Sequence, residues 1–131
     1  MKPRFLDLDE VLHLHARQLE AFGGSPGIRD LGALQSALSM PGAGLGDQYF
    51  HTDLWSMASA YLFHLCQNHP FVDGNKRVAL AASRYFLHLN GLGFAGKSDD
   101  LLALTLNTAS GKLKKPAIAA YFKRHAKRKR S

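Results

Sequence analysis

The sequence has one cysteine, Cys66, and lacks any long apolar run. A single cysteine cannot form an internal disulfide, so the simplest expectation is a cytoplasmic protein. A membrane-spanning helix needs roughly 20 consecutive apolar residues, and no segment approaches that length. The basic N-terminus, Met1–Phe5, is followed at once by Asp7, Asp9 and Glu10, which is not the pattern of a secretory signal. We therefore expect no membrane segment and no secretory signal.

Acidic residues are also scarce, with 10 Asp and Glu against 17 Lys and Arg, for a formal charge of +7. Much of the excess lies near the C-terminus, in Lys123, Arg124, Lys127, Arg128, Lys129 and Arg130. A basic tail can bind an anionic partner, either nucleic acid or an acidic protein surface. Because no recognisable nucleic-acid-binding motif accompanies it, we favour a solvated, frayed terminus and expect no direct nucleic-acid binding. The expected organisation is a single domain, residues 1–125, with a basic tail, residues 126–131.

Hydrophobic residues make up 46% of the 131 residues, enough for one domain with a sizeable core. Aspartates and Ser98 stand where helices are expected to begin, and glycine or proline stands where they end. The segments 54–67 and 76–90 are apolar on nearly all sides, as expected for helices at the centre of a core. The sequence predicts an all-α fold of about six helices around a central antiparallel pair. Apolar side chains recur at helical spacing over residues 6–22, 31–38, 54–67, 76–90, 99–108 and from 116 onwards.

The stretch Gly42–His51 carries three glycines within its first five residues. This composition predicts a flexible loop or a short hairpin. One interpretation is a flap that grips a segment of a target protein by strand pairing, and the other is a plain connection. The stretch is longer than most connections, which favours the flap.

Cysteine and histidine side chains in the helical segments have structural interpretations. Cys66 and His64 lie in the apolar segment 54–67, which predicts a buried, unreactive thiol and a structural histidine. His13 and His15 are two residues apart and so face different sides of the first helix. We expect surface or partly packed histidines there, and not a shared metal site.

A polar stretch, His69–Arg77, joins the two central segments and reads His-Pro-Phe-Val-Asp-Gly-Asn-Lys-Arg. It leads into a helix, whose first backbone N–H groups are unpaired and attract anions, above all phosphate. Gly74 leaves these groups open to close approach, and Asn75 follows it. Lys76 and Arg77 add positive charge, and an arginine can hold a phosphate through two hydrogen bonds. The pattern predicts a phosphate site at the start of the second central helix.

The same stretch contains groups for proton and metal chemistry. Histidine exchanges protons near neutral pH, so His69 is a candidate general base. Asp73 would repel a phosphate but can hold Mg²⁺, which bridges carboxylate and phosphate oxygens. No protein nucleophile is evident, so direct transfer of a phosphorus group from a nucleotide to an acceptor hydroxyl fits these parts. Taken singly, Asp73–Gly74 is an ordinary turn signal, Asn75 fits a helix cap and Phe71 a core anchor. Only their combination in one loop favours catalysis.

The nine residues His69–Arg77 resemble the signature of the Fic/Doc family, His-x-Phe-x-Asp/Glu-Gly/Ala-Asn-Gly/Lys-Arg. The segments Gly27–Asp30, Tyr61–His64 and Ala109–Lys112 are similar to Doc-type proteins, and the chain length matches the compact Doc branch. The resemblance implies a Fic/Doc-type helical bundle that uses ATP or a related nucleotide to modify a protein side-chain hydroxyl.

The resemblance also implies a role for each polar residue of the motif. Phe71 would anchor the loop, and Gly42–His51 would be the flap that registers the target. His69 would deprotonate the target hydroxyl, Asp73 would hold Mg²⁺, Gly74 and Asn75 would form an anion hole, and Lys76 and Arg77 would bind the nucleotide phosphates.

Lys76 bears on which group is transferred. By the resemblance, Fic enzymes that transfer AMP usually carry glycine at this place, whereas Doc toxins carry lysine, which implies that the γ-phosphate of ATP faces His69. The implied activity is phosphate transfer to a Ser/Thr hydroxyl of a translation factor, elongation factor Tu in the prototype, so that translation stops. Gly74 and Pro70 are typical of the Fic branch, so the motif is a hybrid. AMP transfer is the alternative chemistry, and nucleic-acid binding through the basic tail is a lower alternative.

Glutamate is rare in this sequence, and its scarcity bears on regulation. Glu10 and Glu20 are the only glutamates, and neither follows a serine or threonine by four residues. The chain thus lacks the Ser/Thr-x-x-x-Glu pattern by which many Fic proteins inhibit themselves. The resemblance implies inhibition in trans by a small antitoxin of the prevent-host-death type. The formal charge of +7 would suit an acidic antitoxin tail.

Overall fold

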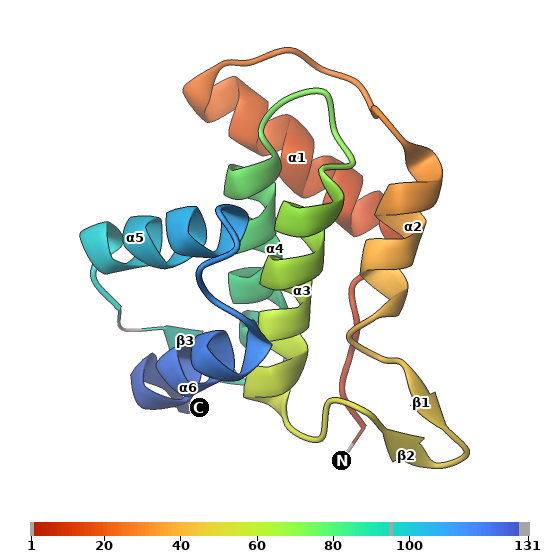
Figure 1. Cartoon of the computed structure of the whole chain (residues 1–131), viewed down its shortest axis with the longest axis vertical. Coiled ribbons are helices and arrows are strands. Elements are labelled where there is room, and N and C mark those ends of the chain that lie inside the picture. The colour runs from red at the N-terminus through yellow and green to blue at the C-terminus, as the bar shows by residue number, and fades with distance from the viewer. Residues whose placement is uncertain (1, 95, 129–131) are drawn as a thin grey trace.

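The computed structural model describes residues 2–94 and 96–128. The predicted all-α fold is confirmed, and the described residues include no helix with the length and apolar character to cross a membrane. They form six helices and four short strands (Figure 1), in the order α1 (Leu8–Phe22), α2 (Leu31–Ser39), β1 (Gly44–Leu45), β2 (Gln48–Tyr49), α3 (Leu54–Asn68), α4 (Asn75–Leu89), β3 (Leu92–Phe94), α5 (Ser98–Ala109), α6 (Lys115–His125) and β4 (Ala126–Arg128).

Aspartates begin three of the helices, as the sequence predicts. Asp7, Asp30 and Asp53 each accept a hydrogen bond from a backbone N–H in the first turn of the helix that follows. The prediction for Ser98 is wrong, because the chain turns helical one residue earlier than expected. Ser98 is the first residue of α5, and Lys97 precedes it without a side-chain cap.

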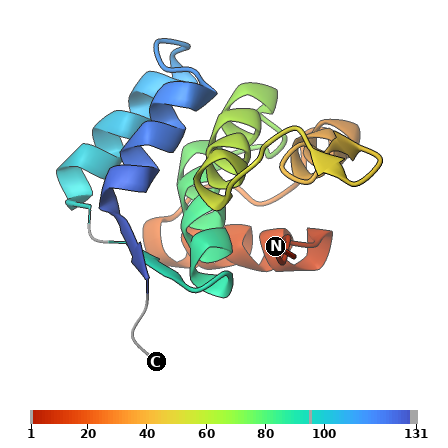
Figure 2. The same cartoon turned by 90° about the horizontal axis from the view of Figure 1, so that it is seen from below.

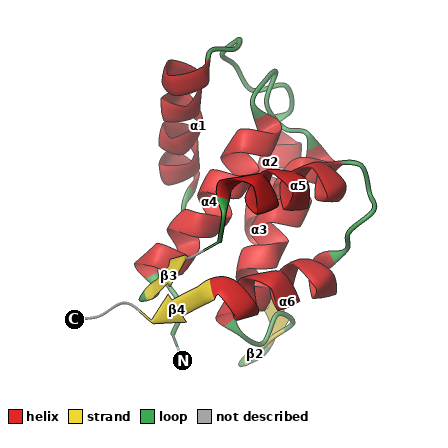
Figure 3. Cartoon of the chain, turned by 90° about the vertical axis from the view of Figure 1, so that its left-hand side faces the viewer, coloured by secondary structure: helices red, strands yellow, loops and turns green. Residues whose placement is uncertain are grey.

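Helices α3 and α4 lie side by side and run in opposite directions through the centre of the molecule, joined by the loop 69–74 (Figures 1 and 3). α1 packs on α4, α2 and α6 pack on α3, and α5 packs on both. Burial of one large apolar side chain stabilises the fold by about 1.5–3 kcal/mol. Because the pair buries several, it holds the loop at its end in a fixed position. The central antiparallel pair is confirmed. Its fully buried side chains include Met57, Ala58, Tyr61, Leu62, Leu65, Val78, Ala79, Ala82 and Phe86.

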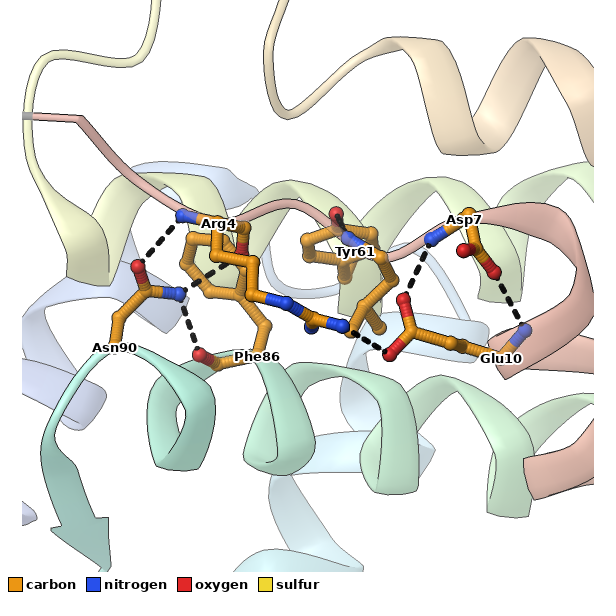
Figure 4. A network of polar contacts seen from close by, with 7 residues as sticks. Arg4, Asp7, Glu10, Tyr61, Phe86 and Asn90 are labelled. Atoms are coloured by element: carbon orange, nitrogen blue, oxygen red, sulfur yellow. Dashed lines mark hydrogen bonds and ion pairs between the residues drawn. The ribbon is translucent and has the colours of Figure 1, made fainter.

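Residues ahead of α1 tie that helix to the central pair (Figure 4). The backbone of Arg4 pairs with the side chain of Asn90 at the end of α4, with N–Oδ1 and O–Nδ2 distances of 2.8 and 3.0 Å. The hydroxyl of Tyr61 in α3 accepts a hydrogen bond from the N–H of Leu6 at 2.8 Å. Glu10, in the first turn of α1, forms an ion pair with Arg4 at 2.9 Å. These contacts fix how α1 lies against the pair.

The hairpin predicted within Gly42–His51 is confirmed as β1 and β2, with Gly44 opposite Tyr49. A side chain at Gly44 would collide with the backbone carbonyl of Gln48, so this position requires glycine. The hairpin precedes α3, whereas the loop 69–74 follows it, and the 15 residues of α3 span about 22 Å. Figures 1 and 3 show the hairpin at the opposite end of the central pair from that loop. The hairpin is therefore distant from the loop 69–74, and its role as a flap stays a prediction.

The sequence does not predict a second sheet, in which β3 and β4 pair antiparallel with Gly93 opposite Lys127 (Figure 3). Figure 2 shows β4 as the continuation of α6. Strands of three residues are too short for an alternating pattern to be visible in the sequence. Ala126–Arg128, the first half of the predicted basic tail, are therefore paired and not frayed. Residues 129–131 of that tail lie outside the described residues.

Candidate active site

The loop between α3 and α4 opens onto a cavity of about 500 Å³. The structure brings together here all the residues predicted to be catalytic, phosphate-binding or metal-binding. Val72 and Leu102, the latter from α5, also line the cavity and are not singled out by the sequence. The full lining is His69, Val72, Asp73, Gly74, Asn75, Lys76, Arg77 and Leu102.

His69 ends α3 in the left-handed conformation, with φ 47° and ψ 55°. Among the described residues it is the one non-glycine residue with positive φ, a conformation that the surrounding structure must hold in place. Its Nδ1 lies 3.1 Å from Nδ2 of Asn75. Since Oδ1 of Asn75 accepts from the N–H of Phe71, its Nδ2 is the donor and Nδ1 of His69 is the acceptor. In this arrangement the neutral ring of His69 carries its proton on Nε2.

Arg29 holds the turn at His69 from outside the motif. Its guanidinium donates to the carbonyl of His69 at 2.6 Å and to that of Asn68 at 2.9 Å. These are carbonyls at the end of α3, which have no partner within the helix. The backbone of residues 27–30 also pairs with that of residues 70–72. The sequence gives no sign of this support beyond the Doc-like character of the segment that contains Arg29.

The carboxylate of Asp73 is exposed and is held by two backbone N–H groups. Ser25 donates to Oδ2 at 3.2 Å and Gly74 donates to Oδ1 at 2.9 Å. The hydrogen bond from Ser25, then that from Gly74, lowers the pKa of Asp73, and the charge of Arg77 adds to the effect. The group is therefore an anion at neutral pH, the state that a metal ligand requires. Gly24 passes so close that a Cβ on it would lie 2.9 Å from Oδ2.

The first turn of α4 is open to an anion. Gly74 precedes the helix with φ 77° and gives no side-chain cap, so the first N–H groups of α4 have no helical partner. Asn75 is buried, and its amide binds the N–H and the C=O of Phe71, each at 2.9 Å. The side chain of Asn75 therefore secures the loop, and only its backbone N–H is available for the predicted anion hole.

Lys76 and Arg77 place two positive charges in this first turn, and both side chains are exposed. The guanidinium of Arg77 lies 4.6 Å from the ring centre of Phe22 at the end of α1, a contact that orients it. Within the described residues neither cation forms an ion pair with a carboxylate. Both are thus available to bind phosphate.

His15 corrects the prediction of a surface or partly packed histidine. It is 5% exposed, its ring stacks on that of Phe71, and its Nε2 lies 2.8 Å from the carbonyl oxygen of Asp73. The local signal was its spacing of four residues from both Val11 and Leu19, which places it on the apolar stripe of α1. His13 is exposed, so the two histidines face different surroundings.

The interpretations of Cys66 and His64 are confirmed. Cys66 is buried, and burial raises the pKa of its thiol to about 12, so it is an unreactive part of the core. His64 is a structural histidine, with Nε2 3.1 Å from Nζ of Lys115. Among the described residues no three histidine, cysteine or acidic side chains are grouped as a metal site. Asp73 is the residue in the lining of the cavity whose carboxylate could hold a metal ion.

Comparison with known proteins shows the family of this chain. The sequence model of the Fic/DOC family matches residues 5–87, and the chain belongs to the Fic/Doc family. Two curated relatives place it in the Doc branch. Toxin Doc of Mycolicibacterium smegmatis is 41% identical over 95 residues, which cover 72% of this chain and 71% of that protein. Protein kinase doc of Escherichia phage P1 is 30% identical over 121 residues, which cover 92% of this chain and 94% of that protein.

Proposed function

We propose that this protein is a Doc-type toxin that transfers the γ-phosphate of ATP to a serine or threonine hydroxyl of a translation factor, with elongation factor Tu as the first candidate. The observation that carries the proposal is the single cavity that contains His69, Asp73 and the open first turn of α4. Phosphate transfer is supported by the name of the phage P1 relative, Protein kinase doc, and by the lysine at Lys76.

The phosphates of ATP fit the first turn of α4, where the unpaired N–H groups and the charges of Lys76 and Arg77 converge. Asp73 fits a Mg²⁺ ion, because its carboxylate is exposed and anionic. Mg²⁺ commonly takes one or two carboxylates and completes its shell with water and phosphate oxygens. When bound, Mg²⁺ supplies neutralising charge to the phosphates.

In the proposed transfer, the oxygen of the target hydroxyl bonds to the γ-phosphorus while the bond from that phosphorus to the bridging oxygen breaks, and ADP leaves. The ring of His69 receives the hydroxyl proton. A histidine that accepts a proton on Nε2 must hold its own proton on Nδ1. The contact with Asn75 favours the other tautomer, so the proposal requires Nδ1 to be released from Asn75 before transfer.

The target must reach the cavity without the β1–β2 hairpin, which lies at the other end of the central pair (Figure 1). We place it on the surface beside the cavity, formed by the exposed connection of residues 23–30 and by Leu102 of α5, whose side chain is 58% exposed. Large apolar side chains exposed next to a polar cavity are suited to contact a protein partner. In the resting cell we expect an antitoxin of the prevent-host-death type to inhibit in trans, and the formal charge of +7 suits an acidic one.

Transfer of AMP to the same kind of hydroxyl is the second candidate function. It is favoured by Gly74 and Pro70, which match the Fic pattern, whereas Lys76 matches the Doc pattern. The two chemistries differ in which phosphorus atom the hydroxyl attacks, and so in which part of ATP remains on the target.

Labelled ATP tests both candidates. The protein is incubated with Mg²⁺, elongation factor Tu and ATP labelled at either the α or the γ phosphorus. We expect label on the factor from the γ position alone, and none with His69→Ala. Label from the α position would establish AMP transfer instead. Absence of label from both positions would exclude this target, and mass spectrometry of cell proteins after expression would then find the modified one.

A further inference from the structure

His15 is a buried polar side chain to which the proposed chemistry gives no role. It lies in α1, 58 residues from Asp73 in the sequence, and is 5% exposed. The ring stacks on Phe71 with ring centroids 3.8 Å apart and planes 10° apart. At its edge, Nε2 is 2.8 Å from the carbonyl oxygen of Asp73. Stacking on Phe71 thus fixes the plane of the ring, and Nε2 at the edge of the ring faces one peptide group of the loop.

That peptide group joins Asp73 to Gly74, and it is trans, as are all peptide bonds of the described residues. The C=O and the N–H of a trans peptide point in opposite directions. Since the C=O faces the buried ring of His15, the N–H of Gly74 faces away from it, toward Oδ1 of Asp73 at 2.9 Å. Asp73 and Gly74 both line the cavity where phosphate is expected, and this N–H is held on the side of the peptide that faces away from His15.

We propose that His15 is a positioning residue, which donates from Nε2 to the carbonyl of Asp73 and so keeps the N–H of Gly74 turned toward the phosphate site. A carbonyl oxygen can only accept, so the contact is a hydrogen bond only when the ring proton is on Nε2. Without this donor the peptide keeps only the hydrogen bond from the N–H of Gly74 to Oδ1 of Asp73, so it rotates more easily and its N–H leaves the site more often. Any loss of phosphate transfer in a His15 variant rests on the proposed function. The hydrogen bond of His15 and the binding of phosphate do not rest on it.

The competing explanation is packing alone, with the ring filling space against Phe71. His15→Phe keeps an aromatic face and removes the donor, whereas His15→Gln keeps an N–H donor and removes the stacked ring. His13→Phe, at an exposed position of the same helix, is the matched control. Thermal unfolding shows whether each variant is folded.

Inorganic phosphate is the probe, and its binding is followed by the backbone amide resonance of Gly74. We expect His15→Phe to bind phosphate about tenfold more weakly or worse, with His15→Gln and His13→Phe within about threefold of wild type, the scale on which supporting hydrogen bonds act at other sites. Equal binding by His15→Phe and wild type would overturn the proposal. Equal weakening in His15→Phe and His15→Gln would overturn it as well, because the donor would then not matter.

The wild-type protein gives a second test that needs no variant. At about pH 8, where an ordinary imidazole is neutral, nitrogen NMR should find the proton of His15 on Nε2. A proton on Nδ1, or no response of Gly74 to phosphate, overturns the proposal even if His15→Phe does not fold. If the tautomer and the phosphate response are as expected but no target is modified, the proposed function fails and the role of His15 stands.

Discussion

Asp73 depends on backbone groups that lie far from it in the sequence. Ser25 donates to its carboxylate from the connection between α1 and α2, and Gly24 approaches it more closely than a side chain would allow. Gly23 and Gly24 both have positive φ, 81° and 121°, but a Cβ at Gly23 would meet no atom within 4 Å. Gly23 and Gly24 therefore both have a backbone conformation that disfavours other residues. They differ in that only Gly24 has other side chains where its own would be.

The pair permits a matched test of Asp73. We expect Gly24→Ala to lower Mg²⁺-dependent turnover of nucleotide about tenfold or more, because the new methyl group would lie 2.9 Å from both the carboxylate of Asp73 and the side chain of Leu19 and must displace them. Gly23→Ala carries the strain of a positive φ, about 1–2 kcal/mol, but no clash, so it should lose stability and keep its turnover. Turnover measured against Mg²⁺ concentration, with the thermal midpoint of each variant, checks the prediction. Similar turnover in the two variants would show that Asp73 is not displaced.

The residues of the motif could be predicted from the sequence because they are contiguous, and all of those predicted to be catalytic, phosphate-binding or metal-binding line one cavity. The residues that hold the loop could not. Arg29 contacts His69 across 40 residues and His15 contacts Asp73 across 58, and nothing in a single sequence pairs such positions. Periodicity could have shown that His15 is buried, but not which carbonyl it faces.

Helix α5 presents two exposed leucines one turn apart, and only Leu102 lines the cavity. This difference tests where the proposed target would contact the protein. We expect Leu102→Gln to raise the KM for the target about tenfold, as loss of an apolar anchor does at other interfaces, with a smaller change in the KM for ATP. Leu106→Gln, at a side chain that is 46% exposed, is the control and should change both less. An unchanged KM for the target in Leu102→Gln would place the target elsewhere.

The hairpin shows what element prediction can and cannot achieve. Glycine spacing in Gly42–His51 predicts a flexible loop or a short hairpin, and the structure has the hairpin, in which Gly44 meets the backbone of the facing strand. The distance of the hairpin from the loop 69–74 is set by the direction and length of α3. The composition of residues 42–51 does not predict that distance. The pairing of β3 with β4 likewise joins segments that are distant in the sequence.

Lys115, the first residue of α6, links that helix to α3 and to the segment after the hairpin. Its Nζ lies 3.1 Å from Nε2 of His64 and 3.2 Å from Nε2 of His51. An ammonium group can only donate, so both imidazoles must be unprotonated at Nε2. Burial, aided by the charge of Lys115, lowers the pKa of His64 to about 4 and also lowers that of His51.

This cluster predicts a loss of stability in acid. The unfolded chain takes up the proton of His64 near pH 6.5 and the folded chain only near pH 4, so the stabilisation is complete above about 6.5 and is lost as pH falls toward 4. The thermal midpoint should fall by several degrees across this window. His64→Gln should reduce the fall, whereas His13→Gln, at an exposed histidine, should leave it unchanged. A fall that His64→Gln does not reduce would assign the acid sensitivity to other groups.

At the scale of the whole molecule, a formal charge of +7 is compatible with two kinds of partner, nucleic acid or an acidic protein. The part of the basic C-terminus that the structure describes has a structural role, because β4 pairs with β3. A chain that ends at His125 would lose these backbone partners and should unfold at a lower temperature. Lys129 and Arg130 lie outside the described residues.

Removing residues 129–131 therefore separates the two kinds of partner. The deletion takes two positive charges from the formal +7 and leaves +5. If the protein acts through its cavity, the shortened chain should arrest growth on expression and label its target as the full chain does. His69→Ala in the full chain is the opposite control, since it keeps the tail and should lose both effects. Growth arrest that persists in His69→Ala but is lost when residues 129–131 are removed would contradict the proposed enzymatic function. It would favour nucleic-acid binding, because the activity would then depend on the tail and not on the cavity.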